Sequence, residues 1–146
     1  MQTSFLRTLI VCGACIHVAG TLSAEVAAFP LLITAMTSHV RGRAELARVA
    51  AQLVSHVVSA VGAATVVLWL GYWLALGQGG RHAVFLIGCL FLLSLQFTRL
   101  RHPPAMASGG AVLCGIDPAA VIACVAITGA ALISEPLLLR VWRPRH

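Results

Sequence analysis

The sequence predicts an all-α fold, an integral membrane bundle of four helices joined by short loops. Hydrophobic residues make up 60% of its 146 residues and charged residues only 10%, whereas about a quarter of an ordinary soluble domain is charged. The apolar residues form runs long enough to cross a bilayer. Arginines lie at the edges of these runs, where they anchor helix ends and meet lipid headgroups. A chain of this length is expected to form a single domain.

Four apolar segments account for the predicted helices. They extend approximately over residues 8–36, 46–76, 83–98 and 118–139. The opening of the first segment, with Arg7 before an apolar run and Leu22-Ser23-Ala24 after it, is also typical of a cleaved signal. Cleavage there would leave a remainder too short to span, so we expect an uncleaved helix. The second segment ends near Trp69, Tyr72 and Trp73, aromatic residues that favour headgroup depth.

Turn residues separate the later segments. Gly77-Gln78-Gly79-Gly80 predicts a turn before the third helix, and His102-Pro103-Pro104 ends that helix, because proline disfavours helical geometry in the preceding residue. The small-residue stretch 105–116 is expected to be a loop or a short surface helix. Asp117-Pro118 then predicts the start of the fourth helix, with Asp as N-cap and Pro at the first helical position.

The net charge of +6 comes from arginines set against few acidic residues. A basic balance can indicate nucleic-acid binding, but here the basic residues alternate with membrane-length segments, so we expect the lipid bilayer as partner and no nucleic acid. The arginines divide evenly between the two sides of the predicted bundle, so the positive-inside rule gives no orientation. The expected location is the inner membrane of a bacterial cell, with several passes.

Polar residues inside apolar helices are costly and therefore informative. On the first helix His17, Thr21 and Glu25 follow one another at helical spacing along one face. On the second helix Gln52, Ser55, His56 and Ser59 form a matching face. Both faces are expected to turn away from lipid.

The register predicts a specific contact. Glu25 and His56 lie at nearly equal distances from a hinge centred near Arg41, so an antiparallel pair places them at similar depth. We expect them to form a buried polar pair, either a structural contact or a proton or ion relay. His17 and Gln52 are further candidates for a ligand or relay position, and His17 is otherwise a packed, hydrogen-bonded histidine. No metal site and no cofactor are predicted, with haem or copper binding through His17 and His56 as an alternative.

Short motifs resemble those of uncharacterised bacterial four-helix membrane proteins, and loosely the membrane domain of CopD-type copper-resistance proteins. They are Ile16-His17-Val18-Ala19-Gly20, the stretch 44–50, Gly71-Tyr72-Trp73-Leu74-Ala75 and Ser134-Glu135-Pro136-Leu137-Leu138. The resemblance implies a fold and metal or cofactor handling, without a defined site. Ala24-Glu25-Val26 is similar to the proton-exchanging segment of small multidrug-resistance transporters, which implies proton exchange at Glu25.

The sequence contains nothing like a hydrolytic triad, a phosphate-binding glycine loop or a paired-carboxylate site. The first interpretation is therefore a non-enzymatic membrane protein, a structural or accessory subunit that associates with other membrane subunits or with copies of itself. The second is a proton-coupled small-molecule or ion transporter that uses Glu25 and His56. The third is a haem- or copper-binding membrane protein.

Overall fold

The computed structural model describes residues 13, 17, 28–38, 43–73 and 78–141. Within these ranges every regular element is helical and none is a strand, which confirms the prediction of an all-α fold for this part of the chain. The elements are α2 (Ala28–Thr37), α3 (Arg43–Trp73), α4 (Gln78–Ser94), the 3₁₀ turn η2 (Leu95–Phe97), α5 (Pro103–Leu113) and α6 (Pro118–Val141).

The described helices correspond to the predicted segments, with shifted ends. The segment expected at 46–76 is α3, that at 83–98 is α4 with η2, and that at 118–139 is α6. Of the segment expected at 8–36, the structure describes α2 and the helical residues Gly13 and His17. The backbone N–H of Ala119 donates to Asp117 Oδ1 at 2.9 Å, so Asp117 caps α6 as the sequence predicted.

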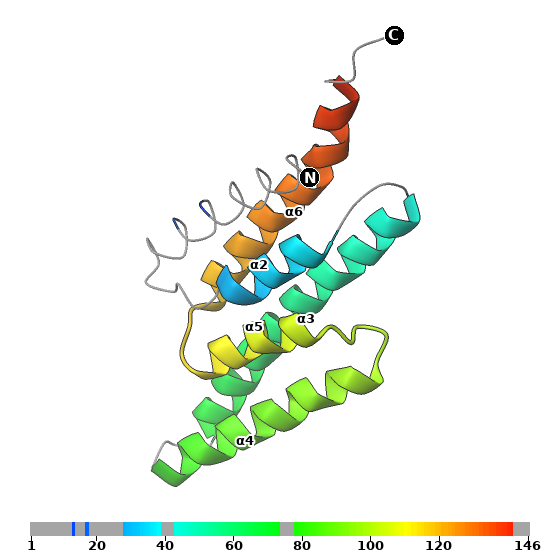
Figure 1. Ribbon diagram of the computed structural model, residues 1–146. Coiled ribbons are helices and arrows are strands. Elements are labelled where there is room, and N and C mark those ends of the chain that lie inside the picture. The colour runs from blue at the N-terminus through cyan, green and yellow to red at the C-terminus, as the bar shows by residue number, and fades with distance from the viewer. Residues whose placement is uncertain (1–12, 14–16, 18–27, 39–42, 74–77, 142–146) are drawn as a thin grey trace.

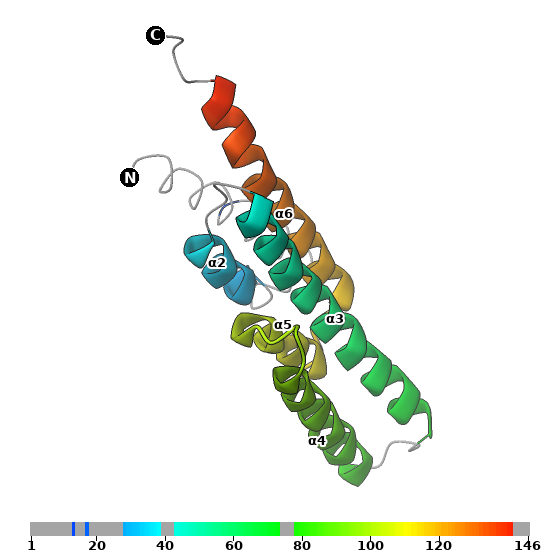
Figure 2. The ribbon, with the colours of Figure 1, turned by 90° about the vertical axis from the view of Figure 1, so that its right-hand side faces the viewer.

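The long helix α3 is the axis of the arrangement (Figures 1 and 2). α4 follows the half of α3 that ends at Trp73, whereas α6 follows the other half, and α5 lies between them. Gly62 of α3 faces the Phe91 ring of α4, and Leu53 of α3 faces Gly129 of α6. The packing partners of α3 therefore change along its length.

Two helical stretches are long and apolar enough to cross a membrane by length and composition. They are Ala44–Gly71 and Gly80–Phe97. Pro118–Ser134 is also apolar but shorter. Among the described residues, these two stretches are the ones that meet the criteria for a membrane span.

The stretch 105–116, expected to be a loop or a short surface helix, is a short helix over most of its length, but it is packed into the fold and not on the surface. Pro103–Leu113 forms α5, and Ala105, Ser108, Gly109, Ala111 and Val112 on it are buried. Small side chains explain this, because they let α5 approach α3 closely. A Cβ added to Gly109 would lie only 2.9 Å from the Ser59 carbonyl oxygen of α3. The composition that suggested a loop thus serves close helix packing.

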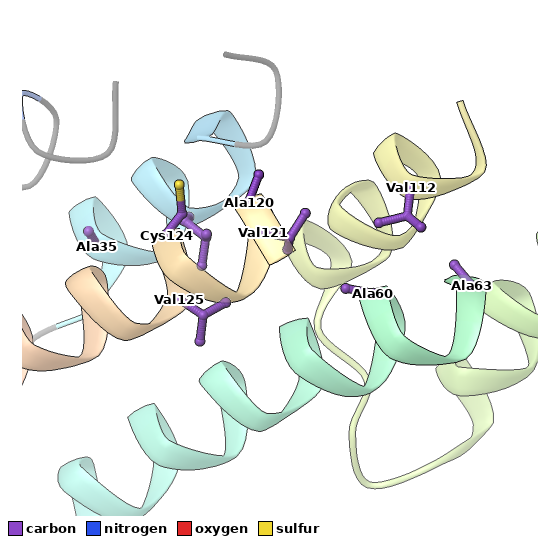
Figure 3. Close-up of a cluster of buried hydrophobic side chains, with 9 residues drawn as sticks. Ala35, Ala60, Ala63, Val112, Ala120, Val121, Cys124 and Val125 are labelled. Atoms are coloured by element: carbon purple, nitrogen blue, oxygen red, sulfur yellow. The ribbon is translucent and has the colours of Figure 1, made fainter. Parts of the chain in front are cut away.

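A cluster of mostly small buried side chains joins four helices (Figure 3). Leu31 and Ala35 come from α2, Ala60 and Ala63 from α3, and Val112 from α5, while α6 contributes Ala120, Val121, Cys124 and Val125. Alanine and valine allow short distances between helix axes, so van der Waals contacts hold the elements together. In this core α2 packs against α5 and α6, and these two helices in turn pack on α3.

Candidate functional site

His56 is a completely buried polar residue in the middle of α3, with a relative exposure of 0%. Its Nε2 lies 2.8 Å from Thr34 Oγ1 of α2, and its Nδ1 lies 2.7 Å from Ser108 Oγ of α5. Both ring nitrogens therefore have hydroxyl partners, as a buried imidazole requires. The contacts join three helices at one point.

Thr34 is the centre of this group. Besides His56, its Oγ1 contacts Nε2 of His102 at 2.9 Å and the carbonyl oxygen of Pro30, one turn earlier in α2, at 3.1 Å. The rings of His56 and His102 meet edge to face with centroids 5.3 Å apart. We refer to Thr34, His56, His102 and Ser108 as the histidine–hydroxyl cluster.

His102 connects the cluster to the surface of the protein. It precedes α5 as its N-cap residue, with extended backbone at φ −146°, because the two prolines that follow disfavour helical geometry before them. The side chain is half-buried, between the exposed Arg101 and Pro103. Burial lowers the pKa of His102 below the ordinary histidine value, which favours the neutral imidazole.

Proton counting shows that the cluster is satisfied without any charge. A threonine hydroxyl donates one hydrogen bond and accepts others. When Thr34 donates to the Pro30 carbonyl, both histidines donate from Nε2 to Thr34, and Ser108 donates to Nδ1 of His56. All four contacts are then hydrogen bonds between neutral groups, so the cluster suits a low-dielectric interior.

A second proton arrangement fits the same positions. Thr34 can instead donate to Nε2 of His56, which then donates from Nδ1 to Ser108, while His102 still donates to Thr34. Only the contact with the Pro30 carbonyl lacks a proton in this arrangement. The cluster thus allows protons to change position without movement of its heavy atoms.

The contact of Ser108 with His56 also has the geometry of a nucleophile beside a general base. Ser108 is 0% exposed, however, and faces α3 from within the packed helix α5. A substrate would reach its hydroxyl only after α5 had moved away. In the described conformation the pair holds helices together.

The structure brings only part of the predicted site together. His56 lies at its centre, and Gln52, one turn earlier, accepts a hydrogen bond at Oε1 from Ser38 Oγ at 2.9 Å. His17 is exposed and does not belong to the cluster. Glu25 lies outside the described residues, so the predicted contact between Glu25 and His56 stays a prediction. Within α2, the residue that contacts His56 is Thr34.

Three members of the cluster were not expected from the sequence. Thr34 is one of two threonines in an otherwise apolar helix, His102 was interpreted only as part of a helix terminator, and Ser108 falls in the stretch expected to be a loop or a short surface helix. One signal was available: His102 and Ser108 are polar residues in a stretch otherwise rich in small residues. Their meeting with His56 depends on the path of α5, which helical periodicity does not give.

Across the described ranges, no three His, Cys, Asp or Glu side chains lie close enough together to hold a metal ion. In the described part of the chain, the two histidine rings that approach each other are those of His56 and His102. No family model matches the chain, and neither a curated protein nor a solved structure is significantly similar to it. The function of the chain can therefore be inferred only from its own residues and their contacts.

Proposed function

We propose that the chain is a non-enzymatic integral membrane protein, a structural or accessory subunit whose histidine–hydroxyl cluster fixes the arrangement of its helices. The observation that carries this proposal is the apolar surface of α3 and α4. Large hydrophobic side chains are widely exposed on both, among them Leu68 at 74% and Leu90 at 58%, and Phe97 of η2, which follows α4, is 94% exposed.

Water is an unfavourable solvent for such a surface. Each large aliphatic or aromatic side chain gains about 1.5–3 kcal/mol when it is fully removed from water, and soluble monomers rarely expose large contiguous apolar patches. On α4 the exposed residues Phe85, Leu86, Leu90 and Leu93 follow at helical spacing. Lipid chains would cover this face without cost, which supports a bilayer around the protein.

The proposal includes a multi-pass arrangement in the inner membrane, with α3 and α4 as two spans. The apolar part of α6 and the predicted first segment would complete the four-helix bundle. Trp69, which is exposed near the end of α3, suits headgroup depth. Arg81, exposed near the start of α4, would lie at the same level in the antiparallel pair.

The neutral state of the cluster supports a structural role. Unsatisfied polar groups are especially costly in hydrocarbon, and here every ring nitrogen of His56 has a partner. Truncation of one member would leave another without its hydrogen bond. Such a cluster specifies one arrangement of α2, α3 and α5, which an accessory subunit needs to present a constant surface to a membrane partner or a second copy.

Membrane extraction tests the first half of the proposal. The protein should stay in the membrane pellet after washing with alkaline carbonate and should need detergent for solubility. A monodisperse sample in buffer without detergent would overturn it. For the second half, mass measurement in mild detergent should give a defined complex larger than one chain, whereas a monomer at all concentrations would contradict an accessory role. Absorption spectra and metal analysis of the same sample test the haem and copper alternative.

A further inference from the structure

The hydroxyl of Thr34 bridges two imidazoles that differ in access to solvent. Its Oγ1 is 2.8 Å from Nε2 of His56 and 2.9 Å from Nε2 of His102. His56 is 0% exposed, whereas His102 is half-buried beside the exposed Arg101. We propose that His56 is a buried proton-binding site that exchanges its proton with solvent through Thr34 and His102. This function goes beyond the structural role of the cluster and does not depend on a membrane.

The geometry supports a concerted transfer along one chain of hydrogen bonds. In the starting arrangement Thr34 donates to Nε2 of His56, and His56 donates from Nδ1 to Ser108. An excess proton arrives at His102, which is then protonated on both nitrogens. The Nε2–H bond of His102 breaks as its proton binds Thr34 Oγ1, and the original Thr34 O–H proton passes to Nε2 of His56.

The products of this step are as well bonded as the reactants. His56 is now an imidazolium that donates from Nε2 to Thr34 and from Nδ1 to Ser108, and both hydroxyl oxygens have lone pairs to accept. The new Thr34 O–H proton points to the vacated Nε2 of His102. One proton has moved from His102 to His56. Thr34 has accepted one proton and given up another, so it stays neutral, and no contact between heavy atoms has been lost.

Protons can reach His56 along this chain of hydrogen bonds from one side only, through His102. Ser108, the last member, is 0% exposed, so the chain of hydrogen bonds ends inside the protein. Described portions of α2 and α5 contribute no acidic or basic side chain, and the only titratable side chain that α6 adds to this core is Cys124. On α3 the charged residues are Arg43, Glu45 and Arg48, which lie near its start, at least two turns before His56.

The nearest charges in sequence to His102 are Arg99 and Arg101, both exposed. Burial disfavours protonation of His102, and no described carboxylate offsets a proton on His56. Protonated His56 is therefore a minor state, and it forms more often as the pH falls. The histidine–hydroxyl cluster conducts protons to His56 but stores them only briefly.

Hydrogen exchange at the His56 ring tests this proposal directly. The full-length protein, labelled with ¹⁵N-histidine, is studied by NMR, and the His56 ring signal is identified by its loss in His56→Asn. In the wild type, exchange of the His56 Nε2 proton with water should accelerate as the pH falls below about 6.5, the ordinary histidine pKa. Burial holds the pKa of His102 lower than that value, so His102 becomes protonated more often only in this range. Thr34→Val removes the bridge and should slow exchange by about tenfold or more, equivalent to about 1.4 kcal/mol in the barrier.

Three further variants keep the test decisive. Thr34→Ser retains the hydroxyl and should exchange like the wild type. Thr37→Val, in the same helix, removes a hydroxyl whose hydrogen bonds go to backbone carbonyls of α2. This variant should also exchange like the wild type. His102→Asn removes the entrance and should slow exchange even if Thr34→Val fails to fold. Wild-type exchange rates in both Thr34→Val and His102→Asn, or an exchange rate in the wild type that does not rise in acid, would overturn the proposal.

Discussion

The close approach of α5 to α3 predicts that two adjacent glycines respond differently to the same substitution. A Cβ at Gly109 would lie 2.4 Å from Leu92 Cδ2 and 2.9 Å from the Ser59 carbonyl oxygen, whereas a Cβ at Gly110 would meet nothing within 4 Å. The side chain of Leu92 can yield, but the backbone of Ser59 cannot do so without moving α3. Gly109→Ala should therefore push α5 away from α3.

The size of the effect follows from the comparison of the two variants. Both gain about 1 kcal/mol of helix propensity when glycine becomes alanine, so this contribution cancels in their difference. Overpacking at a rigid contact costs about 1–3 kcal/mol. Since Ser108 precedes Gly109, the shift should also weaken the hydrogen bond to His56, which is worth about 1 kcal/mol. Gly109→Ala should thus be less stable than Gly110→Ala by about 2–4 kcal/mol, the sum of these two costs.

Thermal unfolding of the detergent-solubilised protein, followed by circular dichroism at matched protein and detergent concentrations, measures the difference. Gly110→Ala should unfold at or above the wild-type midpoint and Gly109→Ala clearly below it. Equal midpoints for the two variants would show that α5 does not pack on the Ser59 backbone, and the position of Ser108 beside His56 would lose its basis.

Three further changes probe the same structure. Ser108→Ala leaves Nδ1 of His56 without its partner and should lower the free energy of unfolding by about 1–3 kcal/mol, whereas Ser94→Ala, at an exposed hydroxyl, should leave it almost unchanged in the same unfolding assay. Gly115→Ala forces a side chain into a backbone with φ +98° and should cost about 1–2 kcal/mol, measured as a lower midpoint. Because burial lowers the pKa of His102, the unfolded chain binds more protons below about pH 6.5; stability should fall as the pH drops through that value, and less so in His102→Asn.

Local patterns in the sequence predict the helices well. The long apolar runs correspond to α3, α4 and α6, and Asp117 caps α6 as expected. Hydrophobic runs and caps act within one element, so they can be recognised without knowledge of its neighbours. The polar face of α3 was also informative, since Ser55, His56 and Ser59 on it are all buried.

The small residues that made α5 difficult to predict are also the residues that let it pack closely on α3. Glycine disfavours helices, so the small residues in the stretch that contains Ser108-Gly109-Gly110 resemble a loop. Their function in the fold is to leave room for another backbone, which is a property of the pair of helices rather than of either one. Only the position of α3 reveals that Gly109 needs to be a glycine.

The register of the first two predicted helices shows a second limit of sequence reasoning. A symmetric hairpin about Arg41 was assumed, but Ser38 lies beside Gln52 and Thr34 beside His56. Both pairs are centred on residue 45, later than the assumed hinge. The end of α2 thus lies level with residues well inside α3, because Leu31 and Ala35 of α2 belong to the shared core, where α2 packs mainly against α5 and α6. Core packing sets the depth of α2.

A buried histidine in an apolar helix requires partners, and the sequence indicated this need correctly at His56. It suggested a charged partner at Glu25, but the contacts in the described part of the chain come from hydroxyls and a second imidazole. Neutral partners suit a low-dielectric interior, because hydroxyls can donate or accept without adding a charge that must itself be compensated. The same property lets protons exchange places along the cluster, so the contacts that fix α2 and α5 on α3 are also those that give His56 access to a proton.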